Sequence, residues 1–279
     1  IKSVAFPDSI RVIGDAAFSE CSSLETVRFN GGNITFYSYA FDYCKALRNV
    51  YVPNEASWLS MEFSTDTSNP LCFGGKLYVN DVLCETFTVP ENVTEIGMYA
   101  FENCSSIKNV VLSSTVTKIA DYAFEKMANL ETVSFSDVLE TIGNAAFYNC
   151  LSLKSLDLPA SLQEICGETF YCCISLESIT VDPDNPNYAS VDDVLFNKDV
   201  TQLILCPAGK SGDYTVPDTV KYISSSSFMG CYNLNNVYMT SVEEIEAYAF
   251  QAASNLAIYI LLGMDPPEEI KGLNGVYID

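Results

Sequence analysis

Apolar residues recur along this chain with a period of about 23 residues. The most regular position of the period is a phenylalanine, which occurs at Phe18, Phe41, Phe101, Phe124, Phe147, Phe170, Phe228 and Phe250. The four copies from Phe101 to Phe170 are each 23 residues apart, and the last two copies are 22 apart. Self-similarity at an interval of 20 to 50 residues is typical of proteins built from stacked repeats.

Each phenylalanine lies in the same frame of apolar residues. Around Phe147 the frame contains Ile142, Cys150, Leu153 and Leu156, and the other copies repeat it closely. The residues after the conserved leucine alternate between apolar and polar, which predicts a half-buried strand. A shorter alternation before the isoleucine predicts a second strand, and the segment Gly-x-x-Ala-Phe-x-x-Cys between them predicts one short helical turn.

No single coil of this kind can bury its own apolar edge, so neighbouring coils must stack on one another. Equivalent strands then run in parallel, about 4.8 Å apart. We therefore expect columns of equivalent Phe, Leu and Cys side chains in the interior. In this arrangement the period decides the fold, whereas it does not identify a ligand.

The run Ile-Gly-Asn-Ala-Ala-Phe-Tyr-Asn-Cys-Leu-Ser-Leu-Lys-Ser-Leu-Asp-Leu-Pro, at residues 142–159, resembles the repeat of the BspA-like leucine-rich repeat family. The resemblance extends over nearly the whole chain. It implies an α/β fold: a right-handed leucine-rich-repeat solenoid, strand-rich, with one short helical turn per coil and stacked parallel sheets. It also implies a secreted or cell-surface location and a role in adhesion, because members of the family are found on host-associated microbes.

We interpret residues 1–279 as a single leucine-rich-repeat solenoid with two expanded coils, at about 54–95 and 182–222. Each expansion has an Asn-Pro pair, a predicted hairpin and a return strand leading into Val-Pro. The hairpins are expected over 77–84, with a turn at Asn80-Asp81, and over 193–205, with a turn at 197–199. The expansions are interpreted as structural variants of a coil, with partner binding as the alternative. Residues 263–279 leave the repeat and are expected to cap the stack.

The charge of the chain disfavours two classes of partner. Its 36 acidic and 14 basic residues give a formal net charge of −22. Nucleic acids and anionic membranes are also negative, so we expect neither nucleic-acid binding nor membrane insertion. The charge either keeps a long surface soluble or steers a basic partner or cation. We expect a monomer.

The chain has 11 cysteines, and six of them occupy one position of the repeat: Cys21, Cys44, Cys104, Cys150, Cys173 and Cys231. Met127 and Ala253 fill the same position in two other coils. This exchange indicates small buried residues in a column. Disulfides between adjacent coils, Cys21–Cys44 and Cys150–Cys173, are the alternative.

Candidate catalytic chemistry is sparse. The chain has no histidine, which excludes Ser-His and Cys-His nucleophiles and His-ligated zinc. Its glycine pairs lack the context of a phosphate-binding loop. The acidic run 182–185 is interpreted as an ordinary turn, with a calcium site as the alternative. We predict no catalytic residue, no metal ligand and no cofactor.

Residues between the buried strand positions must face outward. They form a possible partner-binding face made of Thr26, Arg28, Asn49, Tyr51, Asn109, Val111, Thr132, Ser134, Ser155, Asp157, Ser178, Thr180, Asn236 and Tyr238. Ser and Thr suit exposed strands without any partner. The alternative is a polar binding surface on which Tyr51 and Tyr238 serve as aromatic anchors. Tyr39, Tyr99, Tyr122 and Tyr248, in the expected helical turns, are interpreted as lying beside the core, so most of them need no partner.

These features predict a non-catalytic interaction or adhesion module of a secreted or cell-surface protein. Its partner would be an extracellular protein or glycan, bound through the extended sheet. The alternatives are a structural spacer within a larger surface protein and, less favoured, a glycan-acting enzyme. The chain opens on residues 3–7, which match the end of a coil, so we expect further residues upstream.

Overall fold

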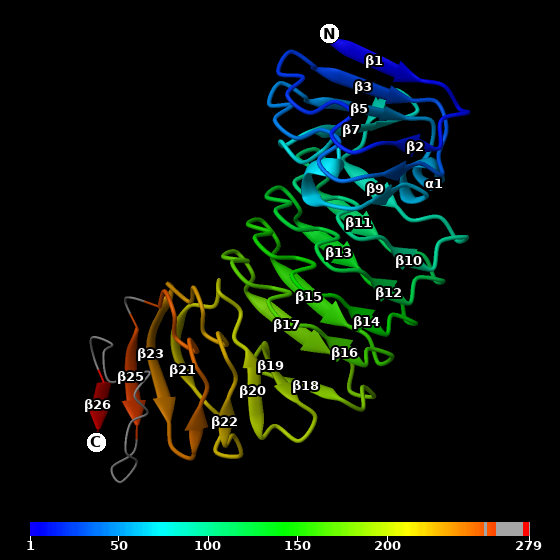
Figure 1. Cartoon of the computed structure of the whole chain (residues 1–279). Coiled ribbons are helices and arrows are strands. Elements are labelled where there is room, and N and C mark those ends of the chain that lie inside the picture. Colours follow the sequence, from blue (N-terminus) through cyan, green and yellow to red (C-terminus); the bar gives the residue numbers. More distant parts are fainter. Residues whose placement is uncertain (254–255, 261–275, 279) are drawn as a thin grey trace. The chain divides into compact units, whose positions relative to one another are not determined.

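Short strands, most of them paired in parallel, recur along the chain and are joined by turns (Figure 1). A computed structural model describes residues 1–253, 256–260 and 276–278. Within these ranges the only helices are α1 (Glu55–Leu59) and the 3-10 turn η1 (Asp66–Ser68). The chain divides into two compact units, Ile1–Leu151 with Gln163–Phe170, and Ser152–Leu162 with Tyr171–Asp279. Each unit is a stack of coils.

In the first unit, the longer strand of each coil contributes to one of two sheets. The first sheet has the order β1 (Ser3–Phe6), β3 (Thr26–Phe29), β5 (Asn49–Val52), β7 (Lys76–Val79) and β8 (Val82–Leu83). The second consists of β13 (Thr132–Ser134), β11 (Asn109–Val111) and β9 (Thr86–Thr88).

The short strands of the first unit form two further sheets. One contains β2 (Val12–Ile13), β4 (Thr35–Phe36) and β6 (Glu62–Phe63). The other contains β10 (Glu95–Ile96), β12 (Lys118–Ile119), β14 (Thr141–Ile142) and β16 (Glu164–Ile165).

The second unit has the same two classes of strand. Its longer strands are β15 (Ser155–Leu158) paired with β17 (Ser178–Val181), and a sheet of β21 (Gly212–Thr215), β23 (Leu234–Met239), β25 (Ala257–Ile260) and β26 (Val276–Ile278). The remaining sheet has the order β18 (Tyr188–Val191), β19 (Val194–Asn197), β20 (Gln202–Leu205), β22 (Tyr222–Ile223) and β24 (Glu244–Ile245). The expected cap lies at 263–279, and its part from 263 to 275 is outside the described residues.

Equivalent residues of neighbouring coils lie on top of one another, as the period predicts. Ile96 pairs in parallel register with Ile119, and Ile119 pairs with Ile142. The rings of Phe101 and Phe124 are stacked with centroids 5.3 Å apart and parallel planes, at an angle of 0°. This separation is close to the strand spacing of a sheet, so one translation places both the backbone and the side chains. The predicted stacked parallel coils are confirmed.

The expected helical turn around each phenylalanine is not helical. The residues two before and two after the phenylalanine have positive φ, between 51° and 73°, in all eight coils. These pairs are Ala16 and Glu20, Tyr39 and Tyr43, Tyr99 and Asn103, Tyr122 and Lys126, Ala145 and Asn149, Glu168 and Cys172, Ser226 and Gly230, and Tyr248 and Ala252. Left-handed residues at this spacing prevent a continuous α-helix.

The reason for this unusual backbone is the destination of its hydrogen bonds. In the first coil, the amides of Ala16, Phe18 and Glu20 donate to carbonyls of the next coil at distances of 2.8 to 2.9 Å. The amides between them close turns within their own coil, for example Ser19 to Ala16 at 3.0 Å. Every second amide of the turn is therefore satisfied by the next coil, and the amides between them by the turn itself. The strained left-handed residues persist because these hydrogen bonds to the next coil stabilise them.

The first expanded coil contains the predicted hairpin. β7 and β8 pair antiparallel around Asn80 and Asp81, whose φ values are 49° and 64°. Two left-handed residues form a type I′ turn, which matches the twist of the strands. The single tryptophan, Trp58 on α1, is buried in this coil and donates from Nε1 to the carbonyl of Ala100 at 3.1 Å.

The second expanded coil contains more pairing than we expect from its sequence. The predicted antiparallel pair is present as β19 and β20, with an irregularity between Leu195 and Phe196. An additional strand, β18, pairs with β19 around a two-residue turn at Asp192 and Asp193. The two expansions also extend different sheets, because β7 and β8 continue the longer strands, whereas β19 and β20 adjoin the short strand β22. Alternation of apolar residues identifies a strand but not its neighbour in a sheet.

Both Asn-Pro pairs have a structural role. Asn69 and Asn185 are fully buried. The side-chain amide of Asn69 donates to the carbonyl of Tyr99 at 2.6 Å, and that of Asn185 donates to the carbonyl of Pro159 at 2.8 Å. Each side chain also accepts a hydrogen bond from a nearby amide of its own loop. The asparagine side chain thus supplies hydrogen bonds to backbone groups at the point where the insertion interrupts the regular backbone bonds between coils.

Replacing Phe124 with Ala should destabilise the first unit by roughly 3 to 5 kcal/mol, because it removes a buried ring and leaves a cavity. Phe124 is fully buried and stacks on Phe101 and on Phe147. Chemical denaturation of the chain measures the effect, with Phe124→Leu as the matched control at roughly 1 to 2 kcal/mol. A cost below about 1 kcal/mol for the alanine variant would contradict the interior column.

At Glu20, substitution by glycine should leave the protein more stable than substitution by alanine, although glycine is normally the more destabilising of the two. Glu20 is exposed and has a φ of 61°, a conformation that costs an L-residue about 1 kcal/mol and glycine little. Glu20→Gly should therefore be more stable than Glu20→Ala by roughly 1 kcal/mol in the same denaturation assay. At the exposed Ser22, whose φ is not positive, the order should reverse. Equal stability of the two Glu20 variants would show that the turn relaxes.

Candidate interaction surface

The outward positions of the longer strands form two columns in each stretch of sheet. Thr26 and Asn49 lie side by side on β3 and β5, and Arg28 and Tyr51 form the second column there. The first unit repeats this on β11 and β13 with Asn109, Thr132, Val111 and Ser134. In the second unit, Ser155, Asp157, Ser178 and Thr180 lie on β15 and β17. Asn236 and Tyr238 lie on β23. All fourteen predicted residues are half-buried or exposed, so their outward orientation is confirmed.

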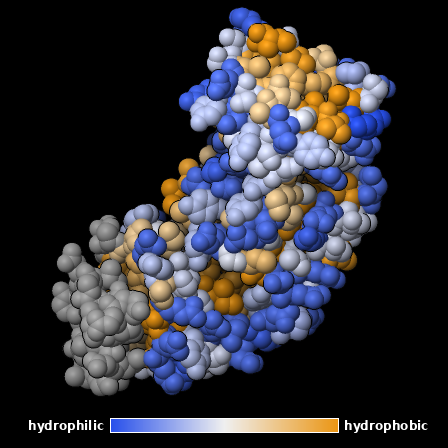
Figure 2. All heavy atoms as spheres, viewed as in Figure 1, coloured by the Kyte–Doolittle hydropathy of each residue, from blue (hydrophilic) through white to orange (hydrophobic). Residues whose placement is uncertain are grey.

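Many polar side chains on these strands bond to the equivalent side chain of the next coil. The side-chain Nδ2 of Asn109 donates to Thr86 Oγ1 at 3.4 Å, and Thr132 Oγ1 donates to Asn109 Oδ1 at 2.7 Å. In the second unit, Asn236 Nδ2 donates to Asp213 Oδ1 at 2.7 Å, and Thr180 Oγ1 donates to Asp157. These ladders hold the side chains in place before any partner arrives. Figure 2 shows hydrophilic residues over much of one face, with smaller apolar areas among them.

Tyr51 is enclosed between two other side chains of the same column. The guanidinium of Arg28 lies 4.3 Å from the centroid of its ring, and the ring of Tyr78 stacks on it at 4.4 Å. Arg28 also forms an ion pair with Asp81 at 2.7 Å. Because Arg28 precedes and Tyr78 follows Tyr51 in the column, both faces of the Tyr51 ring are occupied. Tyr51 can therefore contact a partner by its edge and hydroxyl, and not by stacking.

Tyr78 and Asp81 belong to this cluster but were absent from the predicted face. Both lie in the first hairpin, where the repeat frame cannot assign an outward position. The alternation of side-chain direction along the predicted strand 77–79 could have identified Tyr78, since it places Tyr78 on the face opposite to the buried Leu77. In the second unit Tyr238 stacks on Tyr259 at 4.8 Å. Partial burial, together with Asp213 and Tyr259, raises the pKa of Tyr238, so its hydroxyl stays protonated.

Of the four tyrosines expected to lie beside the core, the interpretation is wrong for Tyr39 and Tyr248. Their side chains are 56% and 65% exposed. Both occupy the left-handed position two residues before the phenylalanine. Tyr99 and Tyr122 occupy the same position and are half-buried, with their rings stacked at 5.1 Å.

The cysteine column is confirmed as a column of small buried residues. Cys44, Cys104, Cys150, Cys173 and Cys231 are buried, and Cys21 is partly exposed. Among the described residues no disulfide is formed, so neither alternative, Cys21–Cys44 or Cys150–Cys173, is present. Cys44 Sγ donates to the carbonyl of Phe18 at 2.9 Å, and Cys150 Sγ to that of Phe124 at 3.2 Å. Burial raises the pKa of Cys44 to about 11, which disfavours a reactive thiolate.

The acidic turn at 182–185 folds on itself. Asp182 Oδ1 accepts the amide of Asp184 at 2.9 Å, which is the geometry of an Asx turn. Over the described ranges, no group of three or more His, Cys, Asp or Glu residues is arranged to hold a metal ion.

One buried carboxylate was not predicted. Glu102 follows Phe101 in its turn, is only 2% exposed, and forms an ion pair with Lys126 at 3.0 Å. Lys126 also pairs with Glu125 at 2.9 Å. The second oxygen of Glu102, Oε2, is buried without a hydrogen-bond partner. Burial raises the pKa of Glu102 to about 7, and the Lys126 ammonium offsets part of this shift.

The stacked parallel coils and their apolar columns define a leucine-rich repeat solenoid. The chain belongs to the family described as the BspA type leucine rich repeat region, whose model matches residues 1–68, 73–200 and 210–263 in six copies. The predicted resemblance is thus confirmed. Family membership indicates a protein-interaction or scaffold role. Among curated proteins, none matches this sequence.

Solved structures of bacterial leucine-rich repeat proteins share the fold. The pneumococcal vaccine antigen PcpA is similar with a TM-score of 0.58 and 23% identity, over 92% of this chain and 60% of that protein. A leucine-rich repeat protein from Eubacterium ventriosum has a TM-score of 0.55 and 23% identity, over 93% of this chain and 65% of that one. One from Bacteroides ovatus has a TM-score of 0.59 and 21% identity, over 100% and 69%. The chain therefore spans less than two thirds of the first two proteins.

In the part of the chain that the structure describes, no helix has the length and apolar character needed to cross a membrane.

The pKa of Glu102 predicts a pH-dependent stability. The native carboxyl keeps its proton up to about pH 7, whereas an unfolded glutamate loses it near 4.5. Between these values the native state binds more protons, so the free energy of unfolding falls as the pH rises through this window. Glu102→Gln should remove this loss, and its stability relative to the parent should grow by roughly 1 to 3 kcal/mol from pH 5 to pH 8.

Urea denaturation of both proteins at pH 5 and pH 8 measures this difference. The control is Glu85→Gln, since Glu85 is exposed and pairs with Lys108 at the surface. A difference between Glu102→Gln and the parent that does not change with pH would contradict a buried, protonated Glu102.

Proposed function

We propose that the chain is a non-catalytic interaction module of a secreted or cell-surface protein, and that it binds an extracellular protein or glycan through the outward columns of its longer strands. The observation that carries this proposal is the ordered cluster of Arg28, Tyr51, Tyr78 and Asp81 on β3 to β8. Tyr and Arg are the residues that dominate binding energy at protein interfaces. Because each side chain is already held by its neighbours, these side chains lose little conformational entropy when a partner binds.

Three further features support the proposal. The family has an interaction or scaffold role, and the similar solved structures include a vaccine antigen, PcpA. The outward positions carry few charges despite the net charge of −22, which favours a polar contact surface over a purely solvating one. An enzyme is disfavoured, because the chain has no histidine and burial raises the pKa of several thiols, such as Cys44 and Cys84.

A structural spacer within a larger surface protein is the second candidate. The observation that favours it is the pairing of Thr, Asn and Asp side chains between adjacent coils. Such ladders stabilise the stack and need no ligand. A spacer would bind no member of a ligand panel, whatever its surface residues.

Replacing Tyr51 and Tyr238 together with Ser should weaken binding to a true sheet-face partner by at least tenfold, because each tyrosine is part of an aromatic cluster. The measurement is biolayer interferometry against a panel of extracellular-matrix proteins and glycans. Tyr51→Phe with Tyr238→Phe separates the hydroxyls from the rings, since it preserves stacking.

Tyr248→Ser is the matched control, as this exposed tyrosine lies in a turn and outside the sheet. Circular dichroism at each step confirms that the variants are folded. If panel members bind and the double serine variant retains full affinity, the binding site is not the sheet face. Binding by no panel member would favour the spacer.

A further inference from the structure

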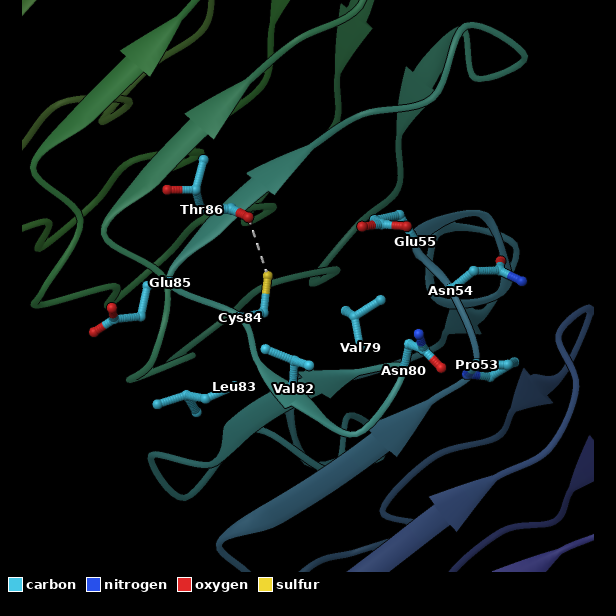
Figure 3. A pocket seen from close by; sticks show the side chains of 10 residues that line it. All are labelled: Pro53, Asn54, Glu55, Val79, Asn80, Val82, Leu83, Cys84, Glu85 and Thr86. Carbon is cyan, nitrogen blue, oxygen red and sulfur yellow. Dashed lines mark hydrogen bonds between the residues drawn. The ribbon is translucent and has the colours of Figure 1, made fainter.

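The first expanded coil contains a cavity. It has a volume of about 540 Å³ and lies between the start of α1, the β7–β8 hairpin and the start of β9 (Figure 3). Val82 and Leu83 border it and are 68% and 38% exposed. Cys84 also lines it, is nearly buried, and donates from Sγ to the carbonyl of Thr86 at 3.4 Å. Two neighbouring exposed aliphatic side chains therefore lie beside a hollow.

The hairpin also presents an unpaired strand edge. β8 is the last strand of its sheet, and its partner is β7. Val82 lies opposite Val79, and the amide of Cys84 donates to the carbonyl of Leu77 at 2.9 Å. In an antiparallel pair, the residue between two such hydrogen-bonded positions directs its N–H and C=O to the other side. Leu83 is that residue, so its backbone groups face the open edge.

The cavity also contains a carboxylate that lacks a basic partner. The side chain of Glu55 projects from the start of α1 beside the cavity (Figure 3). Burial raises the pKa of the Cys84 thiol to about 12, with smaller contributions from Cys104 and then from Glu55. Within the described residues, no Lys or Arg forms an ion pair with Glu55. By contrast, Glu85 at the rim pairs with Lys108 at 2.7 Å, and Asp81 in the adjacent turn pairs with Arg28.

We propose that this cavity binds an extended segment of a partner polypeptide that pairs with the edge of β8 and places a Lys or Arg side chain against Glu55. An open edge recognises extended backbone, since only another strand satisfies its N–H and C=O in line. Val82 and Leu83 supply contacts for the aliphatic side chains of that strand, and Glu55 supplies the charge that selects a basic residue.

This inference rests on the proposed interaction role and names a partner class for it. The site adjoins the cluster around Tyr51, because Leu83 lies opposite Tyr78 on the hairpin. Glu55 and Val82 are not members of that cluster, so substitutions there test the cavity separately. A glycan would be a poorer occupant, because it has neither the backbone to pair with Leu83 nor a positive charge for Glu55.

The experiment uses the whole chain as bait for a phage-displayed library of linear dodecapeptides. We expect enriched peptides to carry Lys or Arg among alternating aliphatic residues. Synthetic versions should bind the parent in fluorescence polarisation, and Glu55→Gln should weaken binding at least fivefold. Val82→Asp should weaken it at least tenfold, and because Val82 is exposed this variant should fold normally. Glu20→Gln is the control, since this exposed carboxylate lies in another coil.

Amide hydrogen exchange reports on the strand edge directly. Saturating peptide should slow exchange at Leu83 by at least tenfold, whereas the amide of Cys84, which is already bonded, should change little. The proposal is overturned if no peptide is enriched, if enriched peptides bind both cavity variants as they bind the parent, or if Leu83 exchange is unaffected. It is also overturned if Val82→Asp abolishes binding of a glycan or self-association in sedimentation, since the occupant would then be of another kind.

The outcomes also separate this site from the sheet face. Peptides that bind the parent and the Tyr51→Ser Tyr238→Ser variant equally, but not Val82→Asp, would support the cavity alone. Panel partners lost in the double serine variant, with no enriched peptide, would leave the sheet face standing and the cavity overturned.

Discussion

The stacking of one coil on the next is the interaction on which the rest of the structure depends. A single coil has no interior of its own, and its phenylalanine is buried by the rings of neighbouring coils, as Phe124 is by Phe101 and Phe147. The same neighbours accept the amides of the left-handed turns. Apolar burial and backbone hydrogen bonding therefore act in the same direction and at the same spacing, which explains how strained turns persist in every coil.

This constraint also shapes the outer surface. Residues that face outward at one repeat position are placed beside their counterparts in the next coil, within reach of a hydrogen bond or a ring contact. The Arg28, Tyr51 and Tyr78 column is the strongest example, and the Asn109 and Thr132 pair is another. Opposite charges at one position follow the same rule, as in Lys2 with Glu25 and Lys118 with Glu95. Each exposed pair contributes below about 1 kcal/mol, yet all of them favour the same register.

Chemistry that differs from the regular coils appears where the stack is interrupted. The first expansion ends one sheet at β8 and begins another at β9, which leaves a strand edge and a cavity lined by Glu55 and Leu83. Buried Asn69 repairs the interior ladder at this point, but nothing among the described residues pairs with the outer edge of β8. At such an interruption the buried polar groups are hydrogen-bonded, whereas those at the surface can remain unpaired. The reason is that an unpaired polar group costs most free energy where water is excluded.

The sequence by itself determined the repeat, the stacked parallel coils, the buried cysteine column and the outward orientation of residues such as Tyr51. It could do so because side chains that recur every 23 residues must fall into columns when coils stack. Only the tertiary structure decided the left-handed turns, the extra strand β18 and the sheet that each expansion joins. It also decided the burial of Glu102 and the enclosure of Tyr51 by Arg28 and Tyr78. The physical reason is that these features depend on which backbone or side chain lies in the adjacent coil, and an apolar pattern records burial without recording the neighbour.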